Sequence, residues 1–136
     1  MREFHLKIVT PDGLEYDGSA ESLLVRTEGG DVEILAGHTD YFAPLGIGRA
    51  RIVINGERRL ASSAGGFISV TKDGVMLVAT TFEFADEIDL ERAKSAKDKA
   101  EEDIKKASDD KSVALAKAKL ARALNRINVA DLIKTR

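Results

Sequence analysis

The amino-acid composition of this chain changes abruptly after Asp86. All 11 Gly, both Pro, all five Phe and both Tyr among the 136 residues precede that point. Residues 87–136 contain none of these types and instead carry ten Ala, 13 Lys and Arg, and ten Asp and Glu. Gly, Pro and aromatic residues suit turns and strands, whereas Ala, Lys and Glu favour helices. The break therefore predicts an α+β protein with two domains, residues 1–86 and residues 87–136.

Residues 1–86 contain the alternation of apolar and polar side chains that is typical of half-buried β-strands. The alternation is clear in residues 4–8 and 49–54. Asn55-Gly56 follows the second of these, and this dipeptide suits the two positive φ angles of a type I′ hairpin turn. Residues 57–64 are the expected partner strand.

A second hairpin is expected across Asp73-Gly74, between strands at residues 67–70 and 75–78. Gly29-Gly30 and Gly65-Gly66 are interpreted as turn and bulge glycines. Short strands separated by glycine turns predict an antiparallel β-sandwich or barrel.

Residues 87–136 favour two helices. Asp89 is a suitable N-cap, since its carboxylate can accept a hydrogen bond from a free N–H of the first turn. Ser108-Asp109-Asp110 then interrupts the helical pattern with residues that prefer caps and turns. On either side of this interruption one row recurs every three or four residues: Leu90, Ala93, Lys97, Ala100, Ile104 and Ala107, then Val113, Ala116, Leu120, Ala123, Ile127 and Ala130. The pattern predicts an antiparallel helical hairpin.

The row along which the two helices are expected to meet consists mostly of alanine. Each buried methylene contributes about 0.8 kcal/mol, so an alanine seam holds two helices together less strongly than a leucine seam of equal length. We expect two stable helices in a loosely held pair, an element able to open without losing its helicity.

The formal charge of −2 divides unequally between the two parts. Residues 1–86 carry 8 basic against 13 acidic residues, a charge of −5, and residues 87–136 carry +3. Nucleic-acid binding is not expected, because neutralising phosphates requires an overall excess of Lys and Arg. The longest apolar run, Val75 to Ala79, is far shorter than the ~20 residues of a membrane-spanning helix. The N-terminus has no apolar signal segment, and the absence of Cys is typical of a reducing compartment.

No catalytic or metal-binding residues are expected. His5 is interpreted as a surface residue of a strand, and His38 as a loop residue with a structural or contact role. Ser62-Ser63 lack a neighbouring base, and no glycine-rich run ends in Lys-Ser or Lys-Thr.

Basic side chains on the two expected helices form one candidate binding site. Arg122 and Arg126 share a helix face, with Lys119 three residues before Arg122. Arg92 begins the other helix, and an antiparallel hairpin brings that end close to Arg122 and Arg126. The three guanidinium groups can either converge on one phosphate-like anion or form a basic face that meets an acidic partner.

Three segments resemble the epsilon subunit of the bacterial F-type ATP synthase. Residues 30–38, Gly-Asp-Val-Glu-Ile-Leu-Ala-Gly-His, are similar to a loop of that family, with Ala36 in place of the usual Pro. Residues 65–70 resemble its Gly-Gly-Phe strand start. Residues 88–93, Ile-Asp-Leu-Glu-Arg-Ala, resemble a segment that the family associates with nucleotide binding. The three occur in order and are followed by an alanine-rich hairpin, so the resemblance covers the whole chain.

The resemblance implies a non-catalytic central-stalk subunit of a rotary, proton-translocating ATP synthase. The sandwich would dock on the gamma subunit and the c-ring, coupling ion-driven rotation to ATP synthesis. The hairpin would lie folded or extended, and when extended its basic face would meet the alpha and beta subunits and inhibit ATP hydrolysis. His38, Lys119, Arg122 and Arg126 are the candidate partner contacts. The subunit would be peripheral, on the cytoplasmic face of the bacterial cell membrane, with no segment inserted.

The resemblance also implies a regulatory ATP site, with or without Mg²⁺, although no cofactor is required. The residues at the matching positions are Glu83, Ile88, Asp89, Arg92, Ala93, Lys99, Arg122 and Arg126. Lys99 stands where strong binders tend to have Arg, which removes a bidentate contact and predicts weaker binding. A sensor whose main role is ATP binding is therefore an alternative function. A stand-alone sandwich enzyme is a third, for which the sequence offers no residues.

Overall fold

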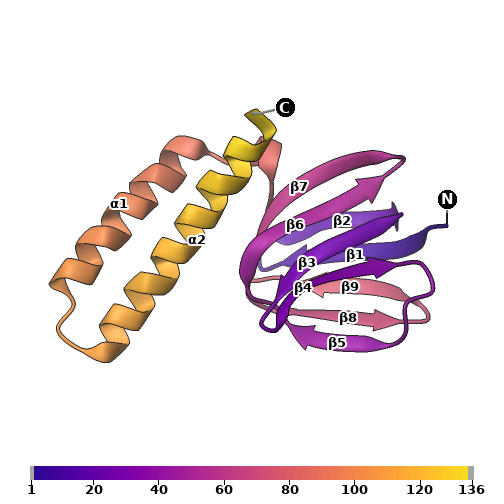
Figure 1. The fold of residues 1–136 in the computed structure, drawn as a ribbon, viewed down its shortest axis with the longest axis horizontal. Helices are drawn as coiled ribbons and strands as arrows, with labels where there is room; N and C mark the ends of the chain where they lie inside the picture. The colour runs from indigo at the N-terminus through magenta and orange to yellow at the C-terminus, as the bar shows by residue number, and fades with distance from the viewer. Residues whose placement is uncertain (1, 135–136) are drawn as a thin grey trace. The chain divides into compact units, whose positions relative to one another are not determined.

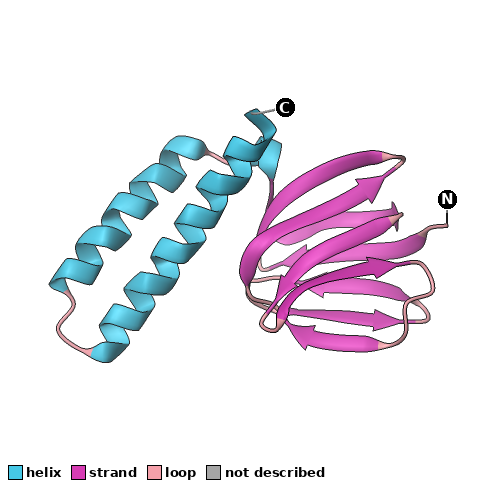
Figure 2. Cartoon of the chain, in the orientation of Figure 1, coloured by secondary structure: helices cyan, strands magenta, loops and turns pink. Residues whose placement is uncertain are grey.

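The computed structural model describes residues 2–134. The chain divides into two compact units, Met1–Phe84 and Ala85–Arg136. The first unit contains two five-stranded sheets and the second contains a short 3-10 helix and two α-helices (Figure 2). The predicted fold class, a β-sandwich followed by a helical hairpin, is confirmed.

The first sheet is built from the two ends and the middle of the first unit (Figure 1). Its strands, in spatial order, are β2 (Gly13–Ala20), β1 (Phe4–Thr10), β9 (Gly74–Val78), β8 (Phe67–Thr71) and β5 (Tyr41–Pro44). All neighbours are antiparallel except β1 and β9, which run parallel. The sheet is therefore mixed, because β1 joins β9 from far along the chain rather than through a hairpin.

The second sheet is fully antiparallel. Its strands, in spatial order, are β10 (Thr81–Phe84), β7 (Glu57–Ala64), β6 (Ile47–Ile54), β3 (Ser22–Thr27) and β4 (Gly30–Leu35). Strand β4 occupies most of residues 30–38, which the resemblance assigned to a loop. That assignment was wrong for residues 30–35, where Val32 and Ile34 turn toward the core and Asp31 and Glu33 remain exposed.

Both hairpins expected from the sequence are present. Strands β6 and β7 pair across Asn55-Gly56, whose φ angles are 51° and 79°, as a type I′ turn requires. Strands β8 and β9 pair across Asp73-Gly74. The local turn chemistry therefore sets the register of these two pairs.

The core of the sandwich lies between the inward faces of the two sheets. Its largest fully buried side chains are β-branched or leucine residues from both sheets: Leu6, Ile8, Leu23, Val25, Ile34, Ile52, Ile68 and Leu77. Burying each side chain of this size contributes about 1.5–3 kcal/mol. The core therefore holds the sandwich as a stable scaffold for residues on its outer faces and loops.

The second unit consists of η1 (Ala85–Glu87), α1 (Leu90–Lys106) and α2 (Asp110–Lys134). The two α-helices pack against each other along their length (Figure 1). Helix α1 ends one residue earlier than the predicted helical row, which ran to Ala107, because Ala107 is extended, with φ −66° and ψ 133°. Ser108 and Asp109 complete the connection, so the predicted antiparallel hairpin is present.

Candidate functional site

Side-chain caps fix the starts of both helices in the hairpin. Asp89 is the N-cap of α1 and accepts a hydrogen bond from the Arg92 backbone N–H at 3.1 Å, as predicted. Asp109 accepts one from the Ser112 N–H at 2.7 Å. This backbone hydrogen bond holds the pKa of the Asp109 carboxyl below its usual value. The caps determine where the basic side chains of each helix fall along its axis.

The seam between α1 and α2 is lined by alanine. Ala93, Ala100, Ala116 and Ala123 are all at most 4% exposed. Ala100 and Ala116 lie eight residues before and after Ser108, and Ala93 and Ala123 lie fifteen before and after it. In an antiparallel pair, residues equally distant from the turn lie at the same height. The buried alanines therefore face each other in two matched pairs.

The same register places three of the predicted site residues at similar positions along the axis of the hairpin. Arg92 lies sixteen residues before Ser108, whereas Arg122 and Arg126 lie fourteen and eighteen after it. At 1.5 Å per residue, the two arginines of α2 lie about 3 Å on either side of the height of Arg92. The three residues therefore lie at similar positions along the hairpin axis, near the end at which α1 begins; that their side chains share one ligand stays a prediction.

These basic side chains differ in exposure. Arg92 is exposed, and Arg122 and Arg126 are half-buried. Within residues 2–134, the side chains of Arg92 and Arg122 form no ion pair with a carboxylate. A half-buried guanidinium without a carboxylate partner favours binding of an external anion, since its charge is partly desolvated.

The remaining candidates for the nucleotide site lie in different surroundings. Ile88 is half-buried between η1 and α1, and Lys99 is exposed on α1, two turns from Arg92. Ala93 is fully buried, so its methyl group packs in the seam and is not open to a ligand. Glu83 belongs to β10, in the other unit. The candidate site within the hairpin therefore rests on Asp89 and the arginines.

Lys119 stands one turn before the arginines on α2 and is exposed. Lys97, in the seam row of α1, forms an (i, i+4) ion pair with Glu101 at 3.1 Å. The hydrogen bond to Glu101 raises the pKa of the Lys97 ammonium. The Lys97 ammonium is thus paired within α1, whereas the Lys119 side chain is exposed on α2.

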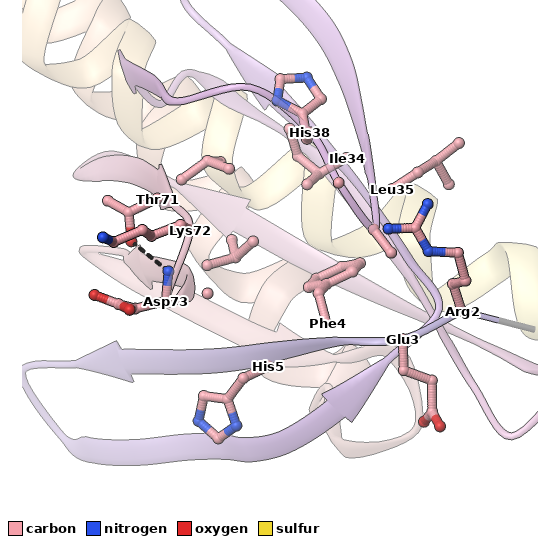
Figure 3. Close-up of a pocket in the computed structure, with 15 residues that line it drawn as sticks. Arg2, Glu3, Phe4, His5, Ile34, Leu35, His38, Thr71, Lys72 and Asp73 are labelled. Carbon is pink, nitrogen blue, oxygen red and sulfur yellow. Dashed lines mark hydrogen bonds between the residues drawn. The ribbon is translucent and has the colours of Figure 1, made fainter.

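His38 lies in the segment between β4 and β5, outside any strand. Its Nδ1–H donates to the Thr39 carbonyl oxygen at 2.7 Å, and its ring meets Tyr41 edge-on at 5.9 Å. His38 also borders an open cavity of about 310 Å³ beside the start of β1, the end of β4 and the β8–β9 turn (Figure 3). Figure 3 shows Phe4 in the middle of the lining residues, with Arg2 on one side and Lys72 on the other. His38 is therefore held by its own loop at the edge of this cavity, and its contact role stays a prediction.

The outer face of the first sheet carries an apolar surface that the sequence did not reveal. The strand register aligns one residue from each of its five strands on this face: Pro44, Phe67, Val78, Val9 and Leu14, here called the apolar row. Leu14 is 57% exposed, and Phe67 stacks on Phe42, which is 66% exposed. Met76, 41% exposed, lies on the same face in β9. Exposed apolar side chains grouped on one face of a sheet are typical of sites of protein association.

Two further properties of residues 2–134 bear on function. No helix there is long and apolar enough to cross a membrane. No cluster of three His, Asp or Glu side chains is arranged to hold a metal ion.

Comparison with known proteins identifies the family. Residues 3–85 match the model of the ATP synthase delta/epsilon chain β-sandwich domain, and residues 86–131 match that of its long α-helix domain. The chain belongs to the ATP synthase delta/epsilon family. The resemblance found in the sequence is confirmed.

Curated relatives agree with this assignment to the ATP synthase delta/epsilon family. The chain is 45% identical over 130 residues to the ATP synthase epsilon chain of Bacillus velezensis, a match that covers 96% of this chain and 98% of the relative. It is 42% identical to the epsilon chain of Bacillus subtilis over the same shares of both chains. The relatives are thus similar along their whole length.

Solved structures share the fold. A chain in the mitochondrial ATP synthase of Euglena gracilis superposes with a TM-score of 0.78 at 21% identity, covering 96% of this chain and 81% of that one. A chain in the central stalk and c-ring structure of the Tetrahymena thermophila enzyme gives a TM-score of 0.69 at 12% identity, covering 95% and 97%. Both matches show that the fold is shared at low sequence identity.

Proposed function

We propose that this chain is a non-catalytic central-stalk subunit of a rotary, proton-translocating ATP synthase, on the cytoplasmic face of the bacterial cell membrane. In this role the sandwich docks on the gamma subunit and the c-ring and helps to couple ion-driven rotation to ATP synthesis. The helical hairpin is the regulatory part and restrains ATP hydrolysis. Membership of the delta/epsilon family supports the proposal, and the apolar row is the observation that carries it.

The apolar row supports docking because it spans all five strands of a rigid sheet. Phe42 and Phe67 form a stacked pair at 5.2 Å on this face, and aromatic residues are enriched in the centres of protein interfaces. The gamma subunit is the proposed occupant of this face. His38 and the loop around it are proposed to contact the c-ring.

Substitution of Phe42 tests the docking surface. Phe42→Ser removes a large, exposed apolar side chain, so the fold is expected to remain intact while affinity for the gamma subunit falls at least tenfold, or about 1.4 kcal/mol. Ile47→Ser, at an apolar residue of β6 that is 36% exposed, is the matched control and is expected to leave binding unchanged. Binding to isolated gamma subunit by calorimetry measures both. Undiminished binding by the Phe42 variant would contradict the proposed surface.

The hairpin is proposed to act through its basic side chains. Lys119, Arg122 and Arg126 lie on one face of α2, in the unit whose charge is +3 over residues 87–136. The weak alanine seam supports a hairpin that opens and extends, and an extended α2 would present this face to acidic surfaces of the alpha and beta subunits.

Charge reversal tests this regulatory role. Replacing both Lys119 and Arg122 by Glu is expected to relieve inhibition of ATP hydrolysis in the reconstituted complex, because attraction to an acidic partner becomes repulsion. Lys105 and Lys106, at the end of α1, provide the matched double reversal. Equal hydrolysis rates for wild-type and both double variants would refute the role of the basic face.

A second candidate function is ATP sensing, which the shared height of Arg92, Arg122 and Arg126 favours. In this case ATP, with or without Mg²⁺, would bind at the Asp89 end of the hairpin and stabilise its folded form. Arg122→Ala is expected to abolish the heat of ATP binding to the isolated chain, whereas Lys117→Ala, at an exposed residue of the same helix, leaves it unchanged. Absence of binding heat in the wild-type chain would eliminate ATP sensing and leave the stalk role intact.

A further inference from the structure

The Asn55-Gly56 dipeptide suits the backbone angles of its turn, but the same dipeptide is chemically prone to loss of the Asn side-chain amide. The type I′ hairpin between β6 and β7 needs positive φ at both positions, which Asn and Gly provide with little strain. Both residues are exposed. In an Asn-Gly pair the glycine nitrogen is unshielded by any side chain and can attack the neighbouring side-chain amide.

The attack proceeds in balanced steps. The Gly56 nitrogen loses its proton and bonds to the Asn55 side-chain carbonyl carbon, and the amide group leaves as ammonia after taking up a proton. The product is a five-membered succinimide ring. Water then opens the ring at either carbonyl, giving Asp or the isomer in which the backbone runs through the side chain. Water is consumed, ammonia is released, and nothing is oxidised or reduced.

The Glu21 side chain forms a hydrogen bond with the Gly56 backbone N–H, whose nitrogen would make this attack. Its Oε1 accepts a hydrogen bond from the Gly56 backbone N–H at 2.8 Å, across 35 positions of sequence. The Glu21 backbone N–H in turn donates to the Val53 carbonyl oxygen at 2.8 Å, so the main chain of Glu21 is anchored to β6. Glu21 itself is half-buried at the corner between β2 and β3.

We propose that Asn55 is a latent deamidation site and that Glu21 is a positioning residue that protects it. The negative carboxylate beside the Gly56 N–H opposes loss of its proton, because a second negative charge would form next to it. The hydrogen bond also engages the same N–H that must lose its proton before the nitrogen can attack. The protection exists only in the folded sandwich, since Glu21 and Gly56 meet through tertiary structure.

Rates of deamidation in the intact chain test the proposal. Ammonia release and peptide mapping for aspartate and iso-aspartate follow the reaction in mildly alkaline buffer. Glu21→Ala is expected to deamidate about fivefold faster than wild-type, equivalent to about 1 kcal/mol of barrier. Glu21→Gln keeps an acceptor oxygen without the charge and is expected to fall between the two.

Two controls distinguish the effect of the Glu21–Gly56 hydrogen bond from a general change in charge or packing near the turn. Glu57→Ala removes a carboxylate next to the same turn and is expected to react at the wild-type rate. Hydrogen exchange of the Gly56 amide is expected to accelerate in Glu21→Ala, which a change in distant packing would not produce. A Glu21→Ala rate equal to wild-type, or equal acceleration by Glu57→Ala, would overturn the proposal.

Discussion

At the scale of single residues, Gly66 is the glycine at which an added Cβ atom would meet the backbone of another strand most closely. This residue has φ +86° and follows Gly65, at φ +71°, in the turn between β7 and β8. A Cβ atom at Gly66 would overlap the carbonyl oxygen of Val78. The Gly-Gly pair is therefore required both by backbone conformation and by the approach of β9.

Gly66→Ala is expected to lower the free energy of unfolding by about 2–4 kcal/mol, from left-handed strain and overlap with β9. Gly29→Ala is the matched control, because its nearest neighbour would be the Thr27 hydroxyl at 3.7 Å, an ordinary contact. Urea unfolding measures both. A Gly66 variant as stable as the Gly29 variant would show that the turn can relax.

At the scale of elements, the two helices are defined by their caps and their seam. Asp89 and Asp109 satisfy N–H groups at the two helix starts, and the alanines fill the contact between the helices. Close approach through alanine gives a small buried apolar area per turn of helix. Packing between the helices therefore contributes less per turn than a leucine seam would, and the caps add to the stability of each helix start.

The start of α2 is expected to depend on pH. The hydrogen bond from Ser112 lowers the pKa of Asp109 in the folded hairpin below its ordinary value of 3.8. Asp109 therefore contributes stability that is complete above the unfolded-state pKa and is lost as pH falls through the lower folded-state pKa.

Asp109→Asn keeps an oxygen that can cap the helix but does not titrate. We expect the amide resonance of Ser112 to shift below about pH 4 in wild-type, in keeping with the ordinary aspartate pKa, and to stay constant in the variant. NMR titration measures this shift. A pH-independent Ser112 resonance in wild-type would contradict the cap.

At the scale of the whole molecule, the two units are stabilised by different means. The sandwich buries large side chains such as Leu77 between two sheets, whereas the hairpin buries mainly alanine. Tyr16 and Tyr41, which are the only tyrosines in a chain without Trp, both belong to the sandwich. Their near-ultraviolet signals therefore report on the sandwich, and far-ultraviolet helical signals report on the hairpin.

Leu77→Ala is expected to destabilise the sandwich by about 2–5 kcal/mol, because it leaves a cavity in the core. Leu120→Ala, at a half-buried position of α2, is expected to shift only the helical signal and by less. Thermal unfolding followed by both signals tests this. A shift of the helical transition by Leu77→Ala as large as that of the tyrosine transition would show that the units unfold as one.

The sequence alone was sufficient for features that depend on nearby residues. The composition break, the Asn55-Gly56 turn, the Asp89 cap and the alanine row each depend on local conformational preference or helical periodicity, which short segments contain. It was also possible to predict that Arg92, Arg122 and Arg126 lie at similar positions along the hairpin axis. A short connection between two helices makes them pack antiparallel, and the residue spacing then sets their relative positions.

Only the tertiary structure decided which distant strands became neighbours. The parallel pairing of β1 with β9 joins Val9 to Val78, and with it the apolar row across five strands; no local pattern encodes that pairing. The contact between Glu21 and Gly56 arises in the same way. Local preference acts over a few residues, whereas the pairing of remote strands depends on burying one common core, so the sequence determined the elements and the packed sandwich determined its surfaces.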